Sequence, residues 1–306
     1  MLRAAIPVRS RPMIPVDETA SEYLRGIRHA SAPVRIRAAR ALAKLAAPPR
    51  EAYPVLIEAA NDSERGVREA AVQALGAFGQ QAIPALVGFL DHPDKYVRRN
   101  AVWAIGKFGP SARSALTGLC NALCDGDPRT SAGAAQALGS MGEVAGPAVP
   151  ALVEAMRGTN VVLCRLAAKS LSQIGAPALE PLMANLRHHD PFVRAEAAIA
   201  LGWMGELAEV AVSELVQLVE AYRPKVLSRT QPVYHAGASG TVTPPAPAPT
   251  RPHTSEESAR VNAIQALGRI GPGAASALML LQEIAGREDE PYRAAAEQAI
   301  ARIVAD

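Results

Sequence analysis

Few side chains in this sequence combine the types and spacing that chemistry requires. His188, His189 and Asp190 stand together as a possible metal cluster, and Cys120 and Cys124 are four residues apart, so one helix face would carry both thiols. We expect the histidine cluster to lie in a turn between two helices and the two cysteines to be small buried residues. The sequence contains no phosphate-binding loop, nucleophile elbow or dinucleotide fingerprint. We therefore expect a protein without catalytic residues, metal or cofactor.

The composition favours closely packed helices. Of 306 residues 49% are apolar but only 4% are aromatic, so the core must consist of Ala, Leu, Val and Ile. The net charge of +3 is too small to indicate a nucleic-acid-binding protein by itself. Three cysteines suggest reduced thiols rather than a disulfide framework. Because the sequence has neither an 18-residue apolar run nor a signal-peptide pattern, we expect a cytoplasmic protein without a membrane segment.

One stretch, Val67–Gly79, recurs along almost the whole chain. Each copy has a central Leu or Ile, here called the anchor, and the anchors are 30 or 33 residues apart except for one interval of 66. A period of this length indicates an array of helical repeats. The anchors are Leu42, Leu75, Ile105, Leu138, Leu171, Leu201, Leu267 and Ile300.

Fixed positions around the anchors define two helices per repeat, called A and B in chain order. Alanine always stands four residues before the anchor, so that neighbouring helices can approach closely. Glycine usually stands four residues after it, which predicts a left-handed residue at the end of helix B. Proline opens several A helices, where its missing N–H costs nothing. The pattern predicts eight antiparallel helix pairs.

Charged residues also recur at the start of each B helix. Arginine usually stands seven residues before the anchor, and an acid stands four residues before the arginine, as in Glu64 and Arg68. This spacing predicts an i,i+4 ion pair in each repeat. Stacking of the repeats would align these pairs into a ladder between neighbours. We interpret the ladder as a packing device, not as a row of catalytic groups.

The acid followed by V-R-x-x-A-A-x-A-L-G-x-x-G, in tandem helix pairs, resembles the HEAT repeats. More specifically, it resembles the short bacterial HEAT-like repeats of the phycobilisome-lyase type. It implies an all-α fold, a right-handed α-α superhelical solenoid of about eight helix pairs. Among relatives of this fold, the deoxyhypusine hydroxylases bind iron through His-Glu pairs. None of the six histidines here is followed by Glu, so the resemblance implies no iron site.

We expect a single solenoid over residues 17–306, preceded by a basic, disordered tail over residues 1–16. Asp17 or Thr19 would cap the first helix. The interval of 66 residues contains an insertion at about 223–254, rich in Pro and Gly, which we expect to form a loop between helices A and B of the seventh repeat. The insertion carries basic residues and no acid.

The functional prediction concerns the residues six before, two before and two after each anchor. They lie opposite the packed side of helix B, and the resemblance places B helices on the concave surface of the solenoid. These three positions hold eight basic residues, one acid (Glu69) and both tryptophans of the chain. The expected binding residues are Arg40, Lys44, Arg99, Trp103, Lys107, Arg165, Lys169, Trp203, Arg269 and Arg302.

This basic groove predicts a non-catalytic scaffold that binds an acidic protein partner. Two alternatives remain open. Repeated basic residues with an exposed tryptophan would also suit a nucleic-acid-binding helical-repeat protein, whose binding would weaken steeply with salt. The resemblance also allows an accessory protein of the phycobilin-lyase type.

Overall fold

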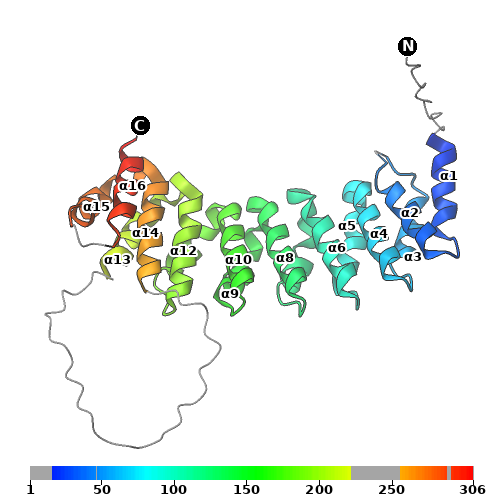
Figure 1. Ribbon diagram of the computed structural model, residues 1–306, viewed down its shortest axis with the longest axis horizontal. Coiled ribbons are helices and arrows are strands. Elements are labelled where there is room, and N and C mark those ends of the chain that lie inside the picture. Colours follow the sequence, from blue (N-terminus) through cyan, green and yellow to red (C-terminus); the bar gives the residue numbers. More distant parts are fainter. Residues whose placement is uncertain (1–15, 46, 222–255, 288–290, 306) are drawn as a thin grey trace, which may run out of the picture. The chain divides into compact units, whose positions relative to one another are not determined.

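The computed structural model describes residues 16–45, 47–221, 256–287 and 291–305. These residues form sixteen α-helices joined by turns and short 3₁₀ segments, and no strand occurs among them (Figure 1). The predicted loop at 223–254 and, apart from Val16, the predicted tail at 1–16 lie outside the described residues. Contacts divide the chain into two compact units, of which the first ends at Phe108 and the second begins at Gly109.

The described helices confirm the eight predicted pairs and the all-α solenoid of repeats. The first unit contains α1 (Val16–Ile27), α2 (Ala32–Leu42), α3 (Ala52–Ala59), α4 (Arg65–Leu75), α5 (Ile83–Gly88) and α6 (Lys95–Gly106). The second unit contains α7 (Leu116–Ala122), α8 (Pro128–Ser140), α9 (Val149–Arg157), α10 (Val161–Ile174), α11 (Leu179–Asn185), α12 (Pro191–Met204), α13 (Val212–Ala221), α14 (Glu256–Ile270), α15 (Leu278–Ala285) and α16 (Arg293–Val304). Odd-numbered helices are A helices and even-numbered ones are B helices.

The start of α1 differs from the prediction. The helix already begins at Val16, so Asp17 and Thr19 lie within its first turn instead of capping it. A single solenoid over residues 17–306 remains a prediction for the two units taken together.

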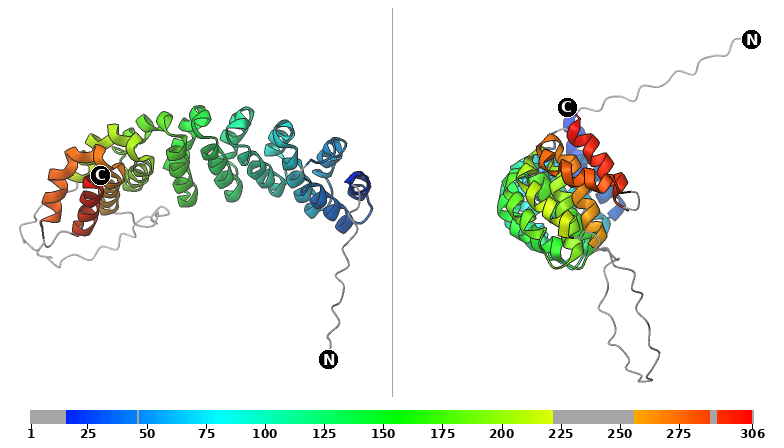
Figure 2. Two further views of the ribbon diagram at one scale, coloured as in Figure 1. Left: turned by 90° about the horizontal axis from the view of Figure 1, so that it is seen from above. Right: turned by 90° about the vertical axis from the view of Figure 1, so that its left-hand side faces the viewer.

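The core of each unit follows the anchor pattern. Seven anchors are fully buried, and the alanines four residues before all eight anchors are at most 4% exposed. The exception, Ile300, is half-buried, because α16 is the last helix of the described chain. Small residues bring successive B helices close together: a Cβ added to Gly202 of α12 would lie 3.0 Å from the Cα of Ala266 in α14. α8 and α10 lie side by side in Figure 1, as do α14 and α16 in both views of Figure 2.

The glycines four residues after the anchors adopt positive φ at all six predicted places: Gly79, Gly109, Gly142, Gly175, Gly205 and Gly271. At Gly205, however, φ is 58° and ψ is −134°. This is not the left-handed helical conformation that the sequence predicted. It lies in an extended region at positive φ that residues with a side chain scarcely enter, so the requirement for glycine is stricter than expected.

One stretch among the described residues, Glu256–Ala285, is long and apolar enough to pass a test for a membrane span. Half of its most apolar part is buried within the protein. Gly271, with φ of 75°, separates the stretch into α14 and α15, which belong to successive repeats. The stretch therefore forms parts of two packed helix pairs.

Arginines at the start of the B helices connect neighbouring repeats. Each of these side chains donates to the two loop carbonyls five and six residues earlier and also pairs with an acid of the next repeat. The pairs, here called the arginine ladder, are Arg35–Asp62, Arg68–Asp94 and Arg194–Glu256. The ladder itself is as predicted. The predicted i,i+4 pair between Glu64 and Arg68 is wrong, because Arg68 pairs instead with Asp94 of the next repeat, with Nη2 2.5 Å from the carboxylate oxygen Oδ2.

Candidate functional site

The exposed side of the B helices carries nearly all of the predicted binding residues. Positions two before and two after the anchors are mostly exposed, and Trp103 and Trp203 are 54% and 47% exposed. Positions six before the anchors are less exposed than expected, since Arg99 is half-buried and Ala195 is fully buried there. At most of the B helices the exposed side is therefore formed mainly by the positions two before and two after the anchor, whereas Arg165 and Ala294 are exposed at the position six before it.

In the first unit, aromatic rings and cations gather on α6. The Lys107 ammonium lies 3.3 Å from the centroid of the Trp103 ring, a cation–π contact. The guanidinium of Arg65 lies 3.1 Å from the Tyr96 ring and that of Arg99 lies 4.9 Å from it. The one acid of the predicted groove, Glu69, pairs with Arg65 at 2.6 Å and is thereby neutralised. The surface around α6 consequently presents cations that are in contact with aromatic rings.

A second feature of the first unit is an open hollow of about 720 Å³ beside α2. Its lining includes the cations Arg37, Arg40 and Lys44, the apolar Ile36 and the ring of Tyr23, and it contains no acid. The three cations follow one another at spacings that place them on one side of α2. The hollow combines positive charge with an apolar floor.

In the second unit, Lys169, Arg269 and Arg302 are exposed on α10, α14 and α16. Arg165 is also exposed, and its Nε lies 3.4 Å from a carboxylate oxygen of Glu196 on α12. Glu196 is only 4% exposed. Burial raises the pKa of the Glu196 carboxyl, and the nearby Arg165 opposes this effect.

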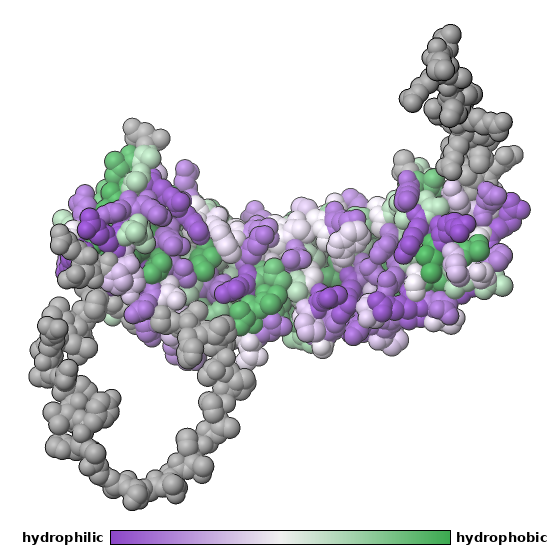
Figure 3. Space-filling view, in the orientation of Figure 1, coloured by the Kyte–Doolittle hydropathy of each residue, from purple (hydrophilic) through white to green (hydrophobic). Residues whose placement is uncertain are grey.

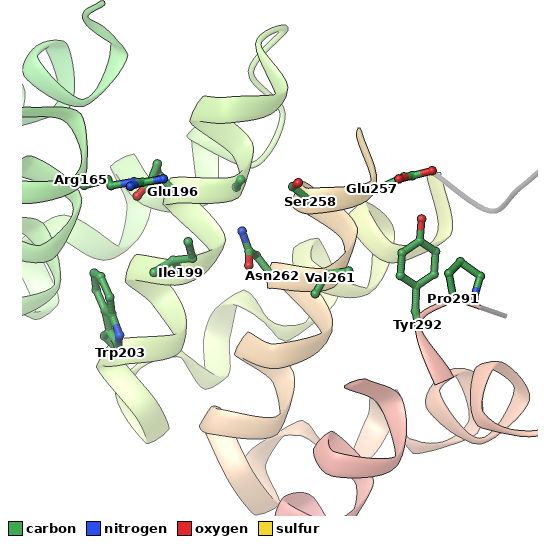
Figure 4. A pocket seen from close by; sticks show the side chains of 11 residues that line it. Arg165, Glu196, Ile199, Trp203, Glu257, Ser258, Val261, Asn262, Pro291 and Tyr292 are labelled. Carbon is green, nitrogen blue, oxygen red and sulfur yellow. The ribbon is translucent and has the colours of Figure 1, made fainter. Parts of the chain in front are cut away.

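The buried Glu196 borders an open hollow of about 640 Å³ in the second unit. Trp203 and Ile199 of α12 line one part of it, and Glu257 of α14 and Tyr292 before α16 line the other (Figure 4). The sequence predicted two of its residues, Arg165 and Trp203, as binding residues but missed Glu196. Glu196 is an acid at a position, five before the anchor, where the other repeats hold none, but nothing in the pattern shows that its side chain is buried beside a hollow.

Two classes of cation can be distinguished by their partners. Ladder arginines are largely buried and bind both loop carbonyls and an acid of the next repeat. By contrast, the following exposed cations make no ion pair within the part of the chain that the structure describes: Arg40, Lys44, Lys107, Lys169, Arg269 and Arg302. Their charges are therefore available to a partner.

Three of the histidines stabilise the turns that precede B helices. His29, His92 and His188 stand thirteen residues before an anchor, and each Nδ1 accepts a hydrogen bond from the backbone N–H two residues later, at 3.0 to 3.1 Å. Asp62 and Asp125 do the same with a carboxylate oxygen. An accepting Nδ1 requires the neutral ring, with its proton on Nε2.

His188 is consistent with this role. Burial, together with the neighbouring His189 and Arg157, lowers the pKa of the His188 imidazole. Asp190 caps α12 by accepting from the N–H of Phe192 at 2.9 Å. Among the described residues, no group of three or more His, Cys, Asp or Glu side chains is arranged to hold a metal ion.

The cysteines differ from the prediction. Cys124 is exposed and lies beyond the end of α7, so its assignment to the core is wrong. Cys120 is half-buried, and burial raises the pKa of its thiol. The buried Cys164 replaces a ladder arginine, and its Sγ donates to the Gly158 carbonyl six residues earlier at 3.1 Å. It thus keeps one of the two loop contacts that an arginine makes.

Hydrophobic residues on the face drawn in Figure 3 form small patches separated by hydrophilic ones. Recognition at that face would therefore depend strongly on polar and charged groups.

Comparison with known proteins identifies the family. The sequence profile of the HEAT repeats matches residues 21–93, 83–171 and 149–230, which together span more than half of the chain. The chain belongs to the HEAT-repeat family. No curated protein matches the sequence.

Solved structures share the fold at low sequence identity. A chain in the structure of Kap95p with RanGDP has a TM-score of 0.55 and 13% identity, over 94% of this chain and 41% of that chain. The complex of CpcE and CpcF of phycocyanin lyase from Nostoc sp. PCC7120 has a TM-score of 0.43 and 18% identity, over 99% of this chain and 100% of that chain. An engineered protein has a TM-score of 0.47 and 20% identity, over 93% and 78% of the respective chains.

Proposed function

We propose that the chain is a non-catalytic scaffold that binds an acidic protein partner through the exposed side of its B helices. The observation that carries this proposal is the contrast between the paired ladder arginines and the six exposed cations, which make no ion pair with any other described residue. Exposed charges of one sign on several B helices raise the local potential and attract a partner of opposite charge. The HEAT-repeat fold, shared with the Kap95p–RanGDP structure, is compatible with this role.

The two tryptophans add anchoring surface to this charge. Trp103 and Trp203 are each about half exposed, one in each unit. Tryptophan and arginine are the residues most enriched at the energetic centres of protein interfaces. An acidic segment that also presents an apolar side chain would suit both the cations and the rings. We also propose a cytoplasmic location for this binding.

The experiment compares two charge-reversed variants of equal net charge. In the face variant, Lys107, Lys169 and Arg269 are changed to Glu; Arg165 is left intact because Glu196 is its partner. The control variant carries the same changes at three exposed arginines outside the predicted positions, namely Arg50, Arg113 and Arg129.

Both variants and the unmodified chain are used for affinity capture from the native cell, with quantitative mass spectrometry. We expect the same proteins to be captured by the unmodified chain and by the control variant, and to be lost with the face variant. Equal capture by the face variant would refute the proposal. Unchanged circular dichroism and melting would show that all three proteins are folded.

Binding of single-stranded nucleic acid is a second candidate, favoured by the exposed Trp103 beside Lys107. Phosphate contacts release counterions, so this function predicts an affinity that falls steeply with salt. Fluorescence anisotropy with a labelled single strand tests it. The absence of binding at 50 mM salt would exclude it.

A further inference from the structure

Attraction between the exposed cations and an acidic partner does not explain why the Glu196 carboxylate is buried. A carboxylate that is 4% exposed, with Arg165 as its single described ion-pair partner, is costly to keep in a helical repeat. The ladder acid Asp94, by comparison, accepts hydrogen bonds from Nε of Arg68 and from the backbone N–H of Tyr96, and it also forms an ion pair with Nη2 of Arg68. Such a costly carboxylate is expected where binding, rather than folding, requires it.

Arg165 is a loose partner for this carboxylate. Its side chain is 62% exposed, and its Nε is 3.4 Å from Glu196, longer than a strong charge-assisted hydrogen bond. A long, mostly solvated arginine can turn away at little cost, since water replaces the contact it loses. Glu196 is therefore accessible to a competing cation that arrives from the hollow.

The walls of the hollow suit a long basic side chain. Figure 4 shows Glu196 and Trp203 on the same side, with Ile199 between them along α12 and Val261 on the facing α14. Ile199, Val261 and the indole of Trp203 would cover the aliphatic stem, while the cationic end reaches Glu196. Glu257, at the far side, adds a second carboxylate against the one cation of the lining, Arg165. The hollow thus has a net negative charge, although it lies within a basic face.

We propose that this hollow accepts a lysine or arginine side chain of the bound protein, with Glu196 as its ion-pair partner and Trp203 as its wall. This inference rests on the proposed function, because it describes one position of the same partner. The partner would then be acidic overall and would carry one basic residue where it meets α12. That residue fixes the register of binding, which uniform attraction between opposite charges does not.

Trp203 provides a direct readout. The chain has two tryptophans, so a Trp103→Phe variant reports only on the hollow through Trp203 fluorescence. The probe is N-acetyl-arginine amide. Its neutral isostere, N-acetyl-citrulline amide, and the acidic N-acetyl-glutamate amide are the controls, all at matched ionic strength.

We expect saturable quenching or a spectral shift with the arginine probe, with a Kd of about 1–10 mM, as is usual for a single side chain. The citrulline probe should bind at least about tenfold more weakly. In the Glu196→Gln variant the arginine response should fall by a similar factor, and its melting temperature should show that the variant is folded.

Three results would overturn the proposal: no saturable response to the arginine probe up to about 50 mM, an equal response to citrulline, or an unchanged arginine response in Glu196→Gln. Tighter binding of the glutamate probe would also overturn it, since Arg165 would then be the recognition group. These outcomes do not depend on the capture experiment with the face variant. The proposal for the hollow can therefore be refuted while the proposed binding through the basic face is supported, and the opposite result can also be detected.

Discussion

The arginine ladder gives the most quantitative prediction, and it concerns Arg68. Its guanidinium donates to the carbonyls of Asp62 and Ser63 at 2.7 and 2.9 Å and pairs with Asp94 at 2.5 Å. Both side chains of the pair are less than one-fifth exposed. Their coupling should therefore exceed that of a surface ion pair, up to about 1 kcal/mol, and fall below that of a fully buried pair, about 3–5 kcal/mol. We expect about 2 kcal/mol.

The perturbation is a double-mutant cycle with Arg68→Ala and Asp94→Asn. Asparagine keeps the cap that Asp94 provides to the Tyr96 N–H but removes the charge. Arg68→Ala alone should cost about 3–4 kcal/mol, because the two loop carbonyls lose their donor as well. The assay is urea unfolding in a Trp203→Phe background, in which Trp103 fluorescence reports the first unit.

The control cycle uses the more exposed pair Arg65–Glu69 on the same helix, with expected coupling of about 0.5 kcal/mol or less. Equal coupling in the two cycles would refute the view that the ladder holds the repeats together. The pH dependence is a second check. Burial opposes ionisation of Asp94, but the Tyr96 N–H and Arg68 outweigh it and lower the pKa of this carboxyl. The coupling should be complete above the ordinary aspartate pKa, about 3.9, and be lost as the pH falls through the lower folded value.

Three further predictions concern turns and the buried acid. His188→Ala should destabilise the protein, whereas an aspartate in its place should still accept the hydrogen bond from the Asp190 N–H. Because folding lowers the pKa of the His188 imidazole, the stability of the wild-type protein should fall as the pH decreases below about 6.5. Urea unfolding at several pH values should show a smaller fall for His188→Asp. Gly205→Ala should cost about 1–3 kcal/mol because of its positive φ, whereas Gly88→Ala, at a negative φ with open space around it, should be neutral or stabilising by thermal melting. Glu196→Gln should be at least as stable as wild type at neutral pH. Burial raises the pKa of the Glu196 carboxyl, so the folded protein loses stability as the pH rises through the folded pKa and this carboxyl ionises. A variant less stable than wild type at neutral pH would contradict this.

The fold was predictable because repetition makes the pattern redundant. Eight copies identified the anchors, the alanines and the glycines that end the B helices, and a period of 30 or 33 residues is compatible with few folds. The detailed geometry was less accessible. Whether Arg68 pairs with Glu64 in its own repeat or with Asp94 in the next depends on the stacking of the helices, and local spacing carries no information about that.

The candidate site was predictable only in part, for the same reason. Helical periodicity correctly predicted that Lys107, Trp103 and Trp203 are exposed, because each lies on the side of its own helix that faces away from the core. The hollow beside Glu196 combines residues of α10, α12, α14 and the segment before α16, so no single helix contains its pattern. A single acid among seven non-acidic equivalents was the one sequence signal available.

The central claim is that the exposed cations of the B-helix side bind an acidic partner. The most direct test is titration calorimetry with a purified protein recovered by the capture experiment, comparing the unmodified chain, the face variant with Lys107, Lys169 and Arg269 reversed, and the matched control variant. We predict at least about a hundredfold weaker binding for the face variant, or about 3 kcal/mol, and less than about threefold for the control. Equal weakening in both variants would show that only the net charge matters and would contradict a dedicated binding face.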